Sequence, residues 1–246
     1  MTIDIIMPTL EQTAVTIRAI QSIPHASKRH QTRLIWIDNG SSEAHRRRVY
    51  EAIQTTQLLS REILMDENRG FPNAVNLGLA HSTENLILLL NNDVEFTQPG
   101  ALDILAEDLI STEGAGMSAP AASSGWQKPA NLAKMRWMTD AGSPAISTPV
   151  TLERDHHPAF FCTLITRQAF HDVGYLTEAV GDGFGEDDDY NERMHAAGWK
   201  RLLCLNAFVQ HDHRTTWKSM YSGAEIREKQ EQSMSYLRKK YGRQVW

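Results

Sequence analysis

Acidic side chains stand at two places in this sequence where carboxylates could do chemistry. At the first, Asn91, Asn92 and Asp93 follow an uninterrupted apolar run at residues 86–90. An acidic side chain just past a buried strand can hold a divalent cation that bridges phosphates. Taken alone, such a cluster is more often a polar turn or a helix cap. The segment therefore predicts a metal site only together with other groups.

The second acidic segment consists of Glu186, Asp187, Asp188 and Asp189 at the start of a predicted helix. A helix N-terminus stabilises each exposed carboxylate by only about 0.3–1 kcal/mol, which hardly requires four acids together. Their mutual repulsion indicates a bound cation or a catalytic role. An ionised aspartate beside a hydroxyl group can act as a general base, which is worth roughly 10²- to 10⁴-fold in rate. An acid-rich first turn is the alternative.

Two histidines follow the apolar run at residues 207–209, in the order His211, Asp212, His213. If the strand continues, both imidazoles lie on one side of it. A neutral imidazole together with Asp93 and two phosphate oxygens would form a mixed nitrogen and oxygen site suited to Mn²⁺ or Mg²⁺. A surface histidine pair without a ligand role is the alternative.

Two further turns have groups that could bind a nucleotide. Asp38 follows the apolar residues 35–37 and could accept a hydrogen bond from a base or a ribose, although a plain Asn-Gly turn is the competing explanation. The segment lacks the GxGxxG spacing, so a hydride-transfer cofactor is not supported. Arg69 stands at a predicted helix start, where a guanidinium suits a diphosphate, or is ordinary on a surface loop.

The elements that must position these groups follow from the hydrophobic pattern. Short apolar runs alternate with helical patterns in the first half, which predicts parallel strands joined by crossover helices. The strands are expected at 3–7, 34–37, 63–65 and 86–90, and the helices at 11–23, 43–59 and 72–81. Because the carboxyl ends of parallel strands share one edge, the polar groups after these strands should gather there.

The second half predicts a less regular arrangement. A helix is expected near 101–111, then loops with room for a hairpin over 117–150, where Ala, Ser, Gly and Pro are frequent. Alternation resumes at 159–166, a helix begins at Gly185 or Glu186 and runs to about 197, and 201–210 is expected to be a strand. The charged segment 219–246 predicts a helix that packs on its own domain, with contact to a membrane surface as the alternative.

Composition excludes several function classes. The 246 residues are 41% apolar and 22% charged, which is typical of one globular domain. The 25 basic and 30 acidic residues give a net charge of -5, with no basic block beyond Arg46, Arg47 and Arg48, so a mainly nucleic-acid-binding role is disfavoured. The cysteines and the apolar runs bear on the compartment. Two cysteines without metal-ligand spacing favour a reducing compartment, and no run approaches the roughly 20 apolar residues that span a bilayer. We therefore expect a cytoplasmic protein.

Taken in order, these segments resemble the family-two inverting glycosyltransferases of the GT-A fold, especially the branch with rhamnosyl- and galactofuranosyltransferases. The resemblance covers nearly the whole chain and implies an α/β fold with a mostly parallel central sheet flanked by helices and a C-terminal acceptor-side subregion. It implies one domain over 1–246, with a nucleotide-binding half at about 1–115, an acceptor and catalytic half at about 116–218 and a C-terminal helix at about 219–246. The matching features are Pro8 and Thr9, the turn 38–42, residues 68–71 with Asn76, residues 91–93, residues 186–189 and His211.

The resemblance also implies roles for individual residues. The nucleotide sugar would be held by Pro8, Thr9, Asp38, Arg69, Gly70, Asn92 and Asp93. A divalent cation, Mn²⁺ or Mg²⁺, would be bound by Asp93 and His211, with His213 as the ligand if the register differs by two. The catalytic residues would be Asp187, as the base that deprotonates the acceptor hydroxyl, and Glu186, which would position the acceptor.

This sequence departs from the family pattern at two points. Asn91 and Asn92 stand where many relatives carry an acid, which implies a modest metal affinity. Asp188 stands where the family often has an apolar residue, so the choice between Asp187 and Asp188 as base stays open. A silent member of the fold that only binds a nucleotide sugar or glycan is therefore one alternative. A metal hydrolase is another, and so is a nucleotidyltransferase, although residues 8–16 lack the Gly and Lys of its usual phosphate loop.

The resemblance favours a UDP- or dTDP-sugar as the donor. A glycan, a lipid-linked glycan or another hydroxyl compound would be the acceptor, and a nucleic acid is not expected as a partner, although a modified base as acceptor stays open. Four aromatic residues, Trp126, Trp137, Phe160 and Trp217, could line an acceptor cleft.

Overall fold

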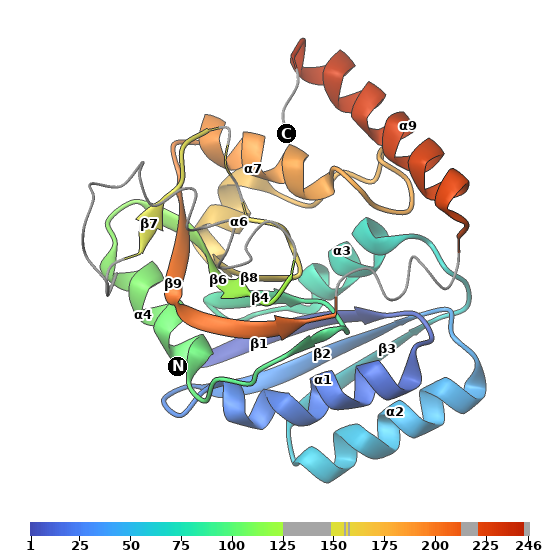
Figure 1. Cartoon of the computed structure of the whole chain (residues 1–246). Coiled ribbons are helices and arrows are strands. Elements are labelled where there is room, and N and C mark those ends of the chain that lie inside the picture. The colour runs from blue at the N-terminus through green and yellow to red at the C-terminus, as the bar shows by residue number, and fades with distance from the viewer. Residues whose placement is uncertain (125–148, 155, 157, 213–220, 244–246) are drawn as a thin grey trace.

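The computed structural model describes residues 1–124, 149–154, 156, 158–212 and 221–243, and it has a central sheet with helices on both faces (Figure 1). The strand order is β3-β2-β1-β4-β8-β6-β9-β5, with β7 paired to β9. One core cluster packs α1, α2 and α4 against one face, and a second packs α3, α6 and α7 against the other. The predicted α/β fold with a central sheet flanked by helices is confirmed.

The first half has the predicted alternation of strands and helices. Its strands are β1 (Thr2–Thr9), β2 (Gln31–Asn39), β3 (Leu59–Met65) and β4 (Leu86–Leu90), and its helices are α1 (Thr13–Ala26), α2 (Glu43–Thr56) and α3 (Phe71–His81). All four strands are parallel. Every residue of β4 is buried because both of its faces are covered, which explains its unbroken apolar run. The carboxyl ends of these strands therefore form one edge of the sheet.

The second half is mixed rather than parallel. It contains β5 (Val94–Glu95), α4 (Ala101–Ser111), β6 (Ala115–Ala122), β7 (Val150–Thr151), β8 (Cys162–Thr166), α6 (Arg167–Val173), α7 (Glu186–Ala196), β9 (Lys200–His211) and α9 (Gly223–Tyr241). Strand β8 runs antiparallel to both β4 and β6, whereas β6 and β9 are parallel. The sheet is thus parallel across β1 to β4 and between β6 and β9, and it is antiparallel where β8, β5 and β7 join it.

Strand β6 corrects the prediction of loops from residue 117 onward. All eight of its residues are buried, between β8 and β9 in the sheet and against α4. Its Ala, Gly, Ser and Pro content resembles a loop, but small side chains also suit a strand that is packed closely on both faces. The predicted hairpin falls mainly on residues 125–148, which lie outside the described residues.

The pairing of β5 with β9 positions the candidate site. Val94 lies opposite His211 and Glu95 opposite Gln210 in an antiparallel register. Arg18 on α1 spans the pair, since its guanidinium contacts Glu95 at 2.8 Å and Asp212 at 3.1 Å. The short strand after the polar segment 91–93 thereby meets the end of β9, although more than one hundred residues separate them.

A buried carboxylate ties the start of β1 to its neighbours. Asp4 is fully buried and accepts hydrogen bonds from Arg33 Nε at 2.7 Å, Arg33 Nη2 at 2.9 Å, and the backbone N–H groups of Thr83 at 2.7 Å and Glu84 at 3.0 Å. The hydrogen bond to Asp4 raises the pKa of Arg33. The carboxylate therefore satisfies four donors at the amino-terminal edge of the sheet.

Replacing Asp4 by alanine is expected to lower the free energy of unfolding by about 3 kcal/mol, because it leaves a guanidinium and two N–H groups without their partner. Urea denaturation would measure the loss. The matched control is Arg29→Ala, which breaks the exposed Arg29–Glu107 pair and should cost about 0–1 kcal/mol. Equal losses in the two variants would contradict this role of Asp4.

Two further expectations concern the cysteines and membranes. Cys162 and Cys204 are both buried free thiols, and burial raises the pKa of each. Among the described residues, no helix has the length and apolar character needed to cross a membrane.

Candidate active site

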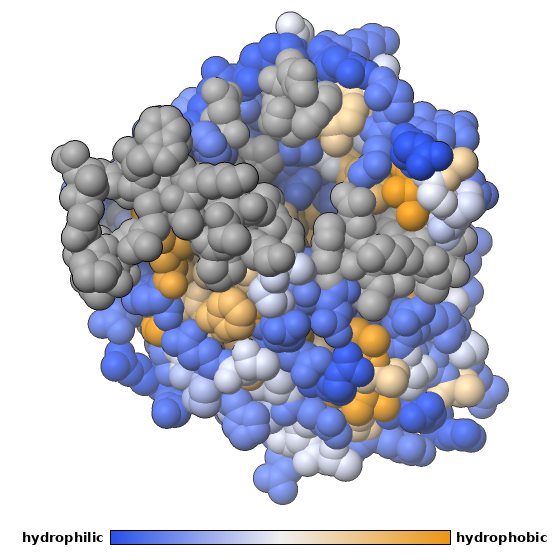
Figure 2. Space-filling model, in the orientation of Figure 1, coloured by the Kyte–Doolittle hydropathy of each residue, from blue (hydrophilic) through white to orange (hydrophobic). Residues whose placement is uncertain are grey.

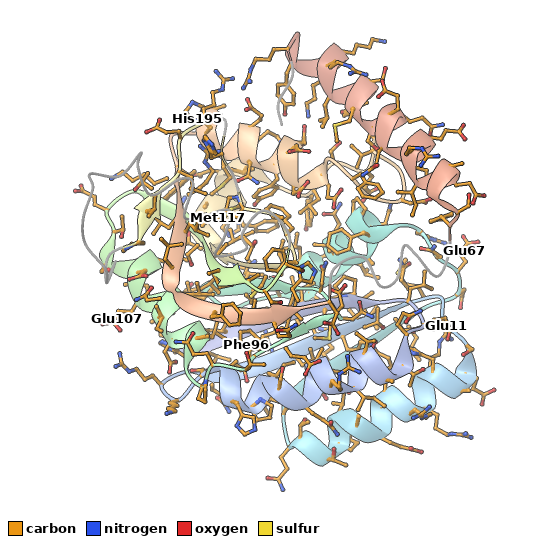
Figure 3. The ribbon with its side chains drawn as sticks, viewed as in Figure 1. Glu11, Glu67, Phe96, Glu107, Met117 and His195 are labelled. Atoms are coloured by element: carbon orange, nitrogen blue, oxygen red, sulfur yellow. The ribbon has the colours of Figure 1, made fainter. Side chains whose placement is uncertain are left out.

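The carboxyl edge of the parallel strands holds most of the predicted nucleotide-binding groups. Figure 3 shows Glu11, after β1, and Glu67, after β3, at this same edge. Glu11 has a left-handed backbone, with φ 50°, and its carboxylate accepts hydrogen bonds from the Ser42 backbone N–H at 2.5 Å and the Ser42 hydroxyl at 3.2 Å. The loop after β1 is therefore joined to the loop after β2, a link that the sequence pattern did not predict.

Asp38 is fully buried at the end of β2. One of its oxygens, Oδ2, accepts hydrogen bonds from Arg46 Nε at 2.7 Å and from the Ser41 backbone N–H at 3.1 Å. The other, Oδ1, has no hydrogen bond within the described part of the chain and lies 3.9 Å from His45 Nε2. Burial lowers the pKa of His45, which favours its neutral form. Among the described residues, Asp38 thus keeps one acceptor oxygen unused.

Thr9 and Pro8 end β1 beside Asp38. Thr9 is buried, and its hydroxyl accepts a hydrogen bond from Trp36 Nε1 at 2.8 Å. Pro8 is buried and lies opposite Ile37 in the sheet. Both residues pack at this edge of the sheet, and the Thr9 hydroxyl already has a hydrogen-bond donor on β2.

Arg69 and Gly70 form the loop before α3. The Arg69 guanidinium is 62% exposed, with Nε 3.4 Å from Glu67 Oε1, so it is accessible to a ligand. The backbone N–H of Arg69 donates to Asn39 Oδ1 at 3.0 Å. Gly70 has φ 84°, and a Cβ there would lie 2.9 Å from both Asp182 Cα and Gly181 O. Close contact with the loop before α7 therefore requires glycine at position 70.

Asp93 and His211 come together as the sequence analysis expected. Asp93 Oδ1 lies 3.4 Å from His211 Nε2, and both side chains are almost completely buried. The backbone N–H of Asp212 donates to the carbonyl of Asp93 at 2.9 Å, which extends the β5–β9 pairing. Asn92 turns away from this pair, since its amide donates to Thr16 Oγ1 on α1 at 2.9 Å.

The imidazole of His211 is held by groups that the sequence analysis missed. The ring of Phe161 stacks on it with a centroid distance of 4.3 Å and an interplanar angle of 19°. The His211 backbone N–H donates to Ser123 Oγ at 2.9 Å, and its carbonyl accepts from Ser124 Oγ at 2.7 Å. Stacking and backbone bonds together fix the ring that faces Asp93.

The Asp93–His211 pair fits part of a divalent cation site. A carboxylate oxygen and an imidazole nitrogen suit Mn²⁺ or Mg²⁺, and neighbouring ligands of a six-coordinate ion of this size lie about 3 Å apart. Among the described residues, no group of three or more His, Cys, Asp or Glu side chains could hold a metal. The remaining ligands would have to be phosphate oxygens or water. His213, the alternative ligand, lies outside the described residues.

The four acids at the start of α7 have different environments. Asp187 is half-buried and accepts a hydrogen bond from the Asp188 backbone N–H at 3.0 Å, whereas Glu186, Asp188 and Asp189 are buried. Asp189 is engaged with Arg193 at 2.8 Å, with Tyr241 at 2.7 Å and with Lys240. Asp189 is thus a structural anchor, and Asp187 is the most accessible of the four carboxylates.

Helix α7 and the segment before it are linked to the other parts of the site. The segment from Pro158 to Phe161 connects α7 to the residues after β4, because Asn191 Nδ2 donates to the Pro158 carbonyl at 3.1 Å and the Asn91 backbone N–H donates to the Phe161 carbonyl at 2.8 Å. The backbone N–H of Phe71 also donates to the Asp182 carbonyl at 3.0 Å, which connects the start of α3 to the segment before α7.

Of the four aromatic residues predicted to line an acceptor cleft, Phe160 is buried edge-on against Tyr190, so it is a core residue rather than a cleft residue. Trp126, Trp137 and Trp217 lie outside the described residues.

The burial of Glu186 makes the free energy of unfolding depend on pH. Burial raises its pKa well above the ordinary value, and the neighbouring Asp187 carboxylate adds to the shift. Since an unfolded glutamate titrates at about pH 4.3, the unfolded chain loses this proton first as pH rises. The Glu186 contribution to stability is therefore present at low pH and is lost as pH rises toward the folded pKa.

We expect Glu186→Gln to reduce the loss of unfolding free energy between pH 5 and pH 8 relative to the wild type. Denaturant unfolding at a series of pH values would measure it. Parallel pH profiles for the two proteins would contradict a neutral, buried Glu186.

Comparison with known proteins identifies the family of this chain. Residues 4–174 match the sequence profile of the family described as Glycosyl transferase family 2. The chain belongs to glycosyl transferase family 2. The match covers the β1–β4 half, the Asp93 segment and β8, whereas α7, β9 and α9 lie beyond it. Among the curated proteins, none matches the chain.

Solved structures of glycosyltransferases share the fold. The mannosyltransferase PcManGT from Pyrobaculum calidifontis, in complex with GDP-Man and Mn²⁺, has a TM-score of 0.69 at 13% identity over 96% of this chain, which spans 64% of that protein. Glucosyl-3-phosphoglycerate synthase from Mycobacterium tuberculosis, in complex with Mg²⁺ and UDP, has a TM-score of 0.64 at 15% identity over 98% of this chain and 79% of that one. S. aureus TarS, in complex with UDP-GlcNAc, has a TM-score of 0.64 at 10% identity over 98% of this chain and 73% of that one. At these identities the likeness establishes the GT-A fold.

Proposed function

We propose that this family-two protein is an inverting glycosyltransferase that uses a divalent cation and a nucleoside-diphosphate sugar. The observation that carries the proposal is the Asp93–His211 pair, which the β5–β9 register assembles at the carboxyl edge of the sheet. The structural neighbours were solved with GDP-Man and Mn²⁺, with UDP and Mg²⁺, and with UDP-GlcNAc, which supports a nucleotide sugar as donor. We favour UDP or dTDP as the nucleotide.

The proposed donor site runs along the carboxyl edge. Asp38 Oδ1 would accept a hydrogen bond from the base, because it is the oxygen of that carboxylate without a partner among the described residues. The exposed Arg69 guanidinium would contact the diphosphate, which planar guanidinium groups bind in a bidentate manner. Asp93 and His211 would hold the cation, which neutralises charge on the departing nucleoside diphosphate when it is bound. Pro8, Thr9, Gly70 and Asn92 would shape this site through their packing and backbone.

The proposed reaction is a single displacement. Asp187 accepts the proton of the acceptor hydroxyl as the acceptor oxygen bonds to the anomeric carbon, while the bond from that carbon to the diphosphate oxygen breaks. Attack opposite the leaving group inverts the configuration. Asp187 suits this role better than Asp188 because it is the more accessible carboxylate, and Glu186 beside it would orient the acceptor.

The remaining assignments belong to the same proposal. Residues 1 to about 115 would bind the nucleotide, about 116–218 would hold the acceptor and the catalytic acids, and α9 completes a single domain. We propose a cytoplasmic enzyme of the rhamnosyl- and galactofuranosyltransferase-like branch, with a glycan or a lipid-linked glycan as acceptor.

Release of nucleoside diphosphate tests this function. The protein would be incubated with UDP-, dTDP- and GDP-sugars, with and without Mn²⁺, and the freed nucleotide would be measured with water as the acceptor. We expect release from a UDP- or dTDP-sugar that requires the metal. Binding of nucleotide sugars without any release, from every donor, would instead support a silent binding module, which Asn91 and Asn92 favour because they replace an acid of the family pattern.

A further inference from the structure

The turn that leads into α7 is held in an unusual backbone conformation. Gly181, Gly183, Phe184 and Gly185 all have positive φ, at 71°, 146°, 66° and 91°. A non-glycine residue such as Phe184 in the left-handed region costs roughly 1 kcal/mol or more, and such conformations persist only where the surroundings determine them. The turn ends one residue before Glu186, so its conformation sets where the acids of α7 begin.

One face of α9 provides these surroundings. Ser233 Oγ lies 3.1 Å from the Lys229 carbonyl of its own helix, 3.2 Å from the Val180 carbonyl and 3.3 Å from the Gly183 carbonyl. Its single proton is therefore shared among three acceptors, and two of these belong to the segment that leads into α7. A Cβ on Gly185 would lie 2.8 Å from Leu237 Cδ1, which shows how closely Leu237 packs on the turn. Ser233 and Leu237 are four residues apart and are the buried residues of α9. They therefore form one contact face directed at the turn.

Ionic contacts extend this face at both ends. Asp182 accepts hydrogen bonds from Lys229 Nζ at 2.5 Å and Tyr221 OH at 3.0 Å, and the Lys229 contact lowers the pKa of Asp182. Asp189 is bound by Lys240 and by Tyr241 from the last turn of α9. Contacts along α9 thus follow the order of residues from the turn into α7, which agrees with the position of α9 beside α7 in Figure 1.

The exposed side of α9 gives little reason to assign the helix to a membrane surface. The upper edge of the molecule in Figure 2, where α9 runs, is largely hydrophilic, and α9 contributes none of the large exposed hydrophobic residues found among the described residues. Such a surface does not favour insertion into a bilayer. The contacts given above join α9 to the turn 181–185 and to the acids on either side of it.

We propose that α9 is a positioning element for catalysis, in which Ser233 and Leu237 hold the turn 181–185 so that Asp187 faces the donor. This inference rests on the proposed function for the role of Asp187. It goes beyond that function because α9 lies outside residues 4–174, the part that matches the family profile. Ser233 and Leu237 are positioning residues, since they act through the turn and not on the substrate.

Four full-length variants test the proposal: Ser233→Ala and Leu237→Ala, with Ser235→Ala as an exposed control two residues away and Leu237→Met as a conservative replacement. Amide hydrogen exchange would be measured over residues 181–188 and, for comparison, over 86–96. Turnover of the donor selected by the nucleotide-release assay would give kcat and KM, and titration with UDP and Mn²⁺ would give the nucleotide affinity.

In Ser233→Ala and Leu237→Ala we expect exchange over 181–188 to accelerate by about 10-fold or more, with 86–96 unchanged. We expect kcat to fall by about 10- to 100-fold while the UDP affinity stays within about twofold, because a displacement of about 1 Å can cost 10²-fold in rate. Ser235→Ala should match the wild type, and Leu237→Met should restore most of kcat, since the swap nearly conserves volume.

Unchanged exchange over 181–188 in both alanine variants would overturn the proposal, and so would an unchanged kcat despite accelerated exchange. Acceleration across the whole chain, with kcat unchanged after correction for unfolded protein, would show that α9 contributes only stability and would also overturn it. Absence of wild-type turnover would instead overturn the proposed function, while the exchange data would still decide whether α9 holds the turn.

Discussion

Replacing Asp187 by asparagine is expected to lower kcat by about 10²- to 10⁴-fold, the usual contribution of a positioned general base. The amide keeps the size of the side chain but cannot take the proton from the acceptor hydroxyl at neutral pH. Nucleotide affinity should stay within about twofold, because Asp187 belongs to α7 and not to the carboxyl edge that holds the donor. Kinetic assay of nucleotide release, combined with a binding titration, would measure both effects.

The neighbouring Asp188 offers a matched control for this substitution. It is the same residue type on the same helix turn, but it is 7% exposed. Asp188→Asn should therefore retain most of kcat. A result in which Asp188→Asn abolishes turnover and Asp187→Asn does not would assign the base to Asp188 and contradict the role given to Asp187.

Removal of either member of the Asp93–His211 pair is expected to have the second large effect. Asp93→Ala or His211→Ala should weaken Mn²⁺ binding by more than the roughly 10- to 100-fold that the loss of an outer-shell partner costs. Among the described residues, Asp93 and His211 are the two protein donors placed 3.4 Å apart, and each variant removes one of them. Electron paramagnetic resonance of free Mn²⁺, titrated with protein in the presence of UDP, would measure the affinity without any turnover.

Asp212→Ala is the control for the metal measurement. Asp212 follows His211 directly, but its side chain is 41% exposed and contacts Arg18. Its replacement should leave Mn²⁺ affinity within a few-fold of the wild type. If Asp93→Ala bound Mn²⁺ as tightly as Asp212→Ala, the pair at the β5–β9 junction would not be the cation site.

The first half of the fold could be predicted because its signals are local. The apolar run of β4 gave boundaries that the structure reproduces, and the helical pattern of residues 72–81 agrees with α3 to within one residue. Strand β6 could not be recognised in this way, since its small side chains are explained by packing between β8 and β9 and not by its own pattern. Short helix α6 was also missed, because seven residues give little periodicity to detect.

The site shows the same division between local and long-range information. The sequence placed Asp93 after a strand and His211 at the end of another, and the structure brings the two side chains together. The ring of Phe161 on His211 and the anchoring of Asp189 by Lys240 and Tyr241 depend on contacts across about 50 residues of chain. Residue type at those positions indicates a core aromatic or a charged helix end, so their partners could not be inferred.

Thermal stabilisation by nucleotides tests the central claim most directly. UDP, dTDP and GDP would each be added with and without Mn²⁺ to the wild type and to Asp93→Ala. A ligand at 100 times its dissociation constant stabilises the folded state by about 2.7 kcal/mol, which is readily seen as a rise in Tm. A shift with UDP or dTDP that needs Mn²⁺ and disappears in Asp93→Ala is the result we predict. No shift with any nucleotide, or an equal shift in Asp93→Ala, would contradict a metal-assisted donor site at this edge of the sheet.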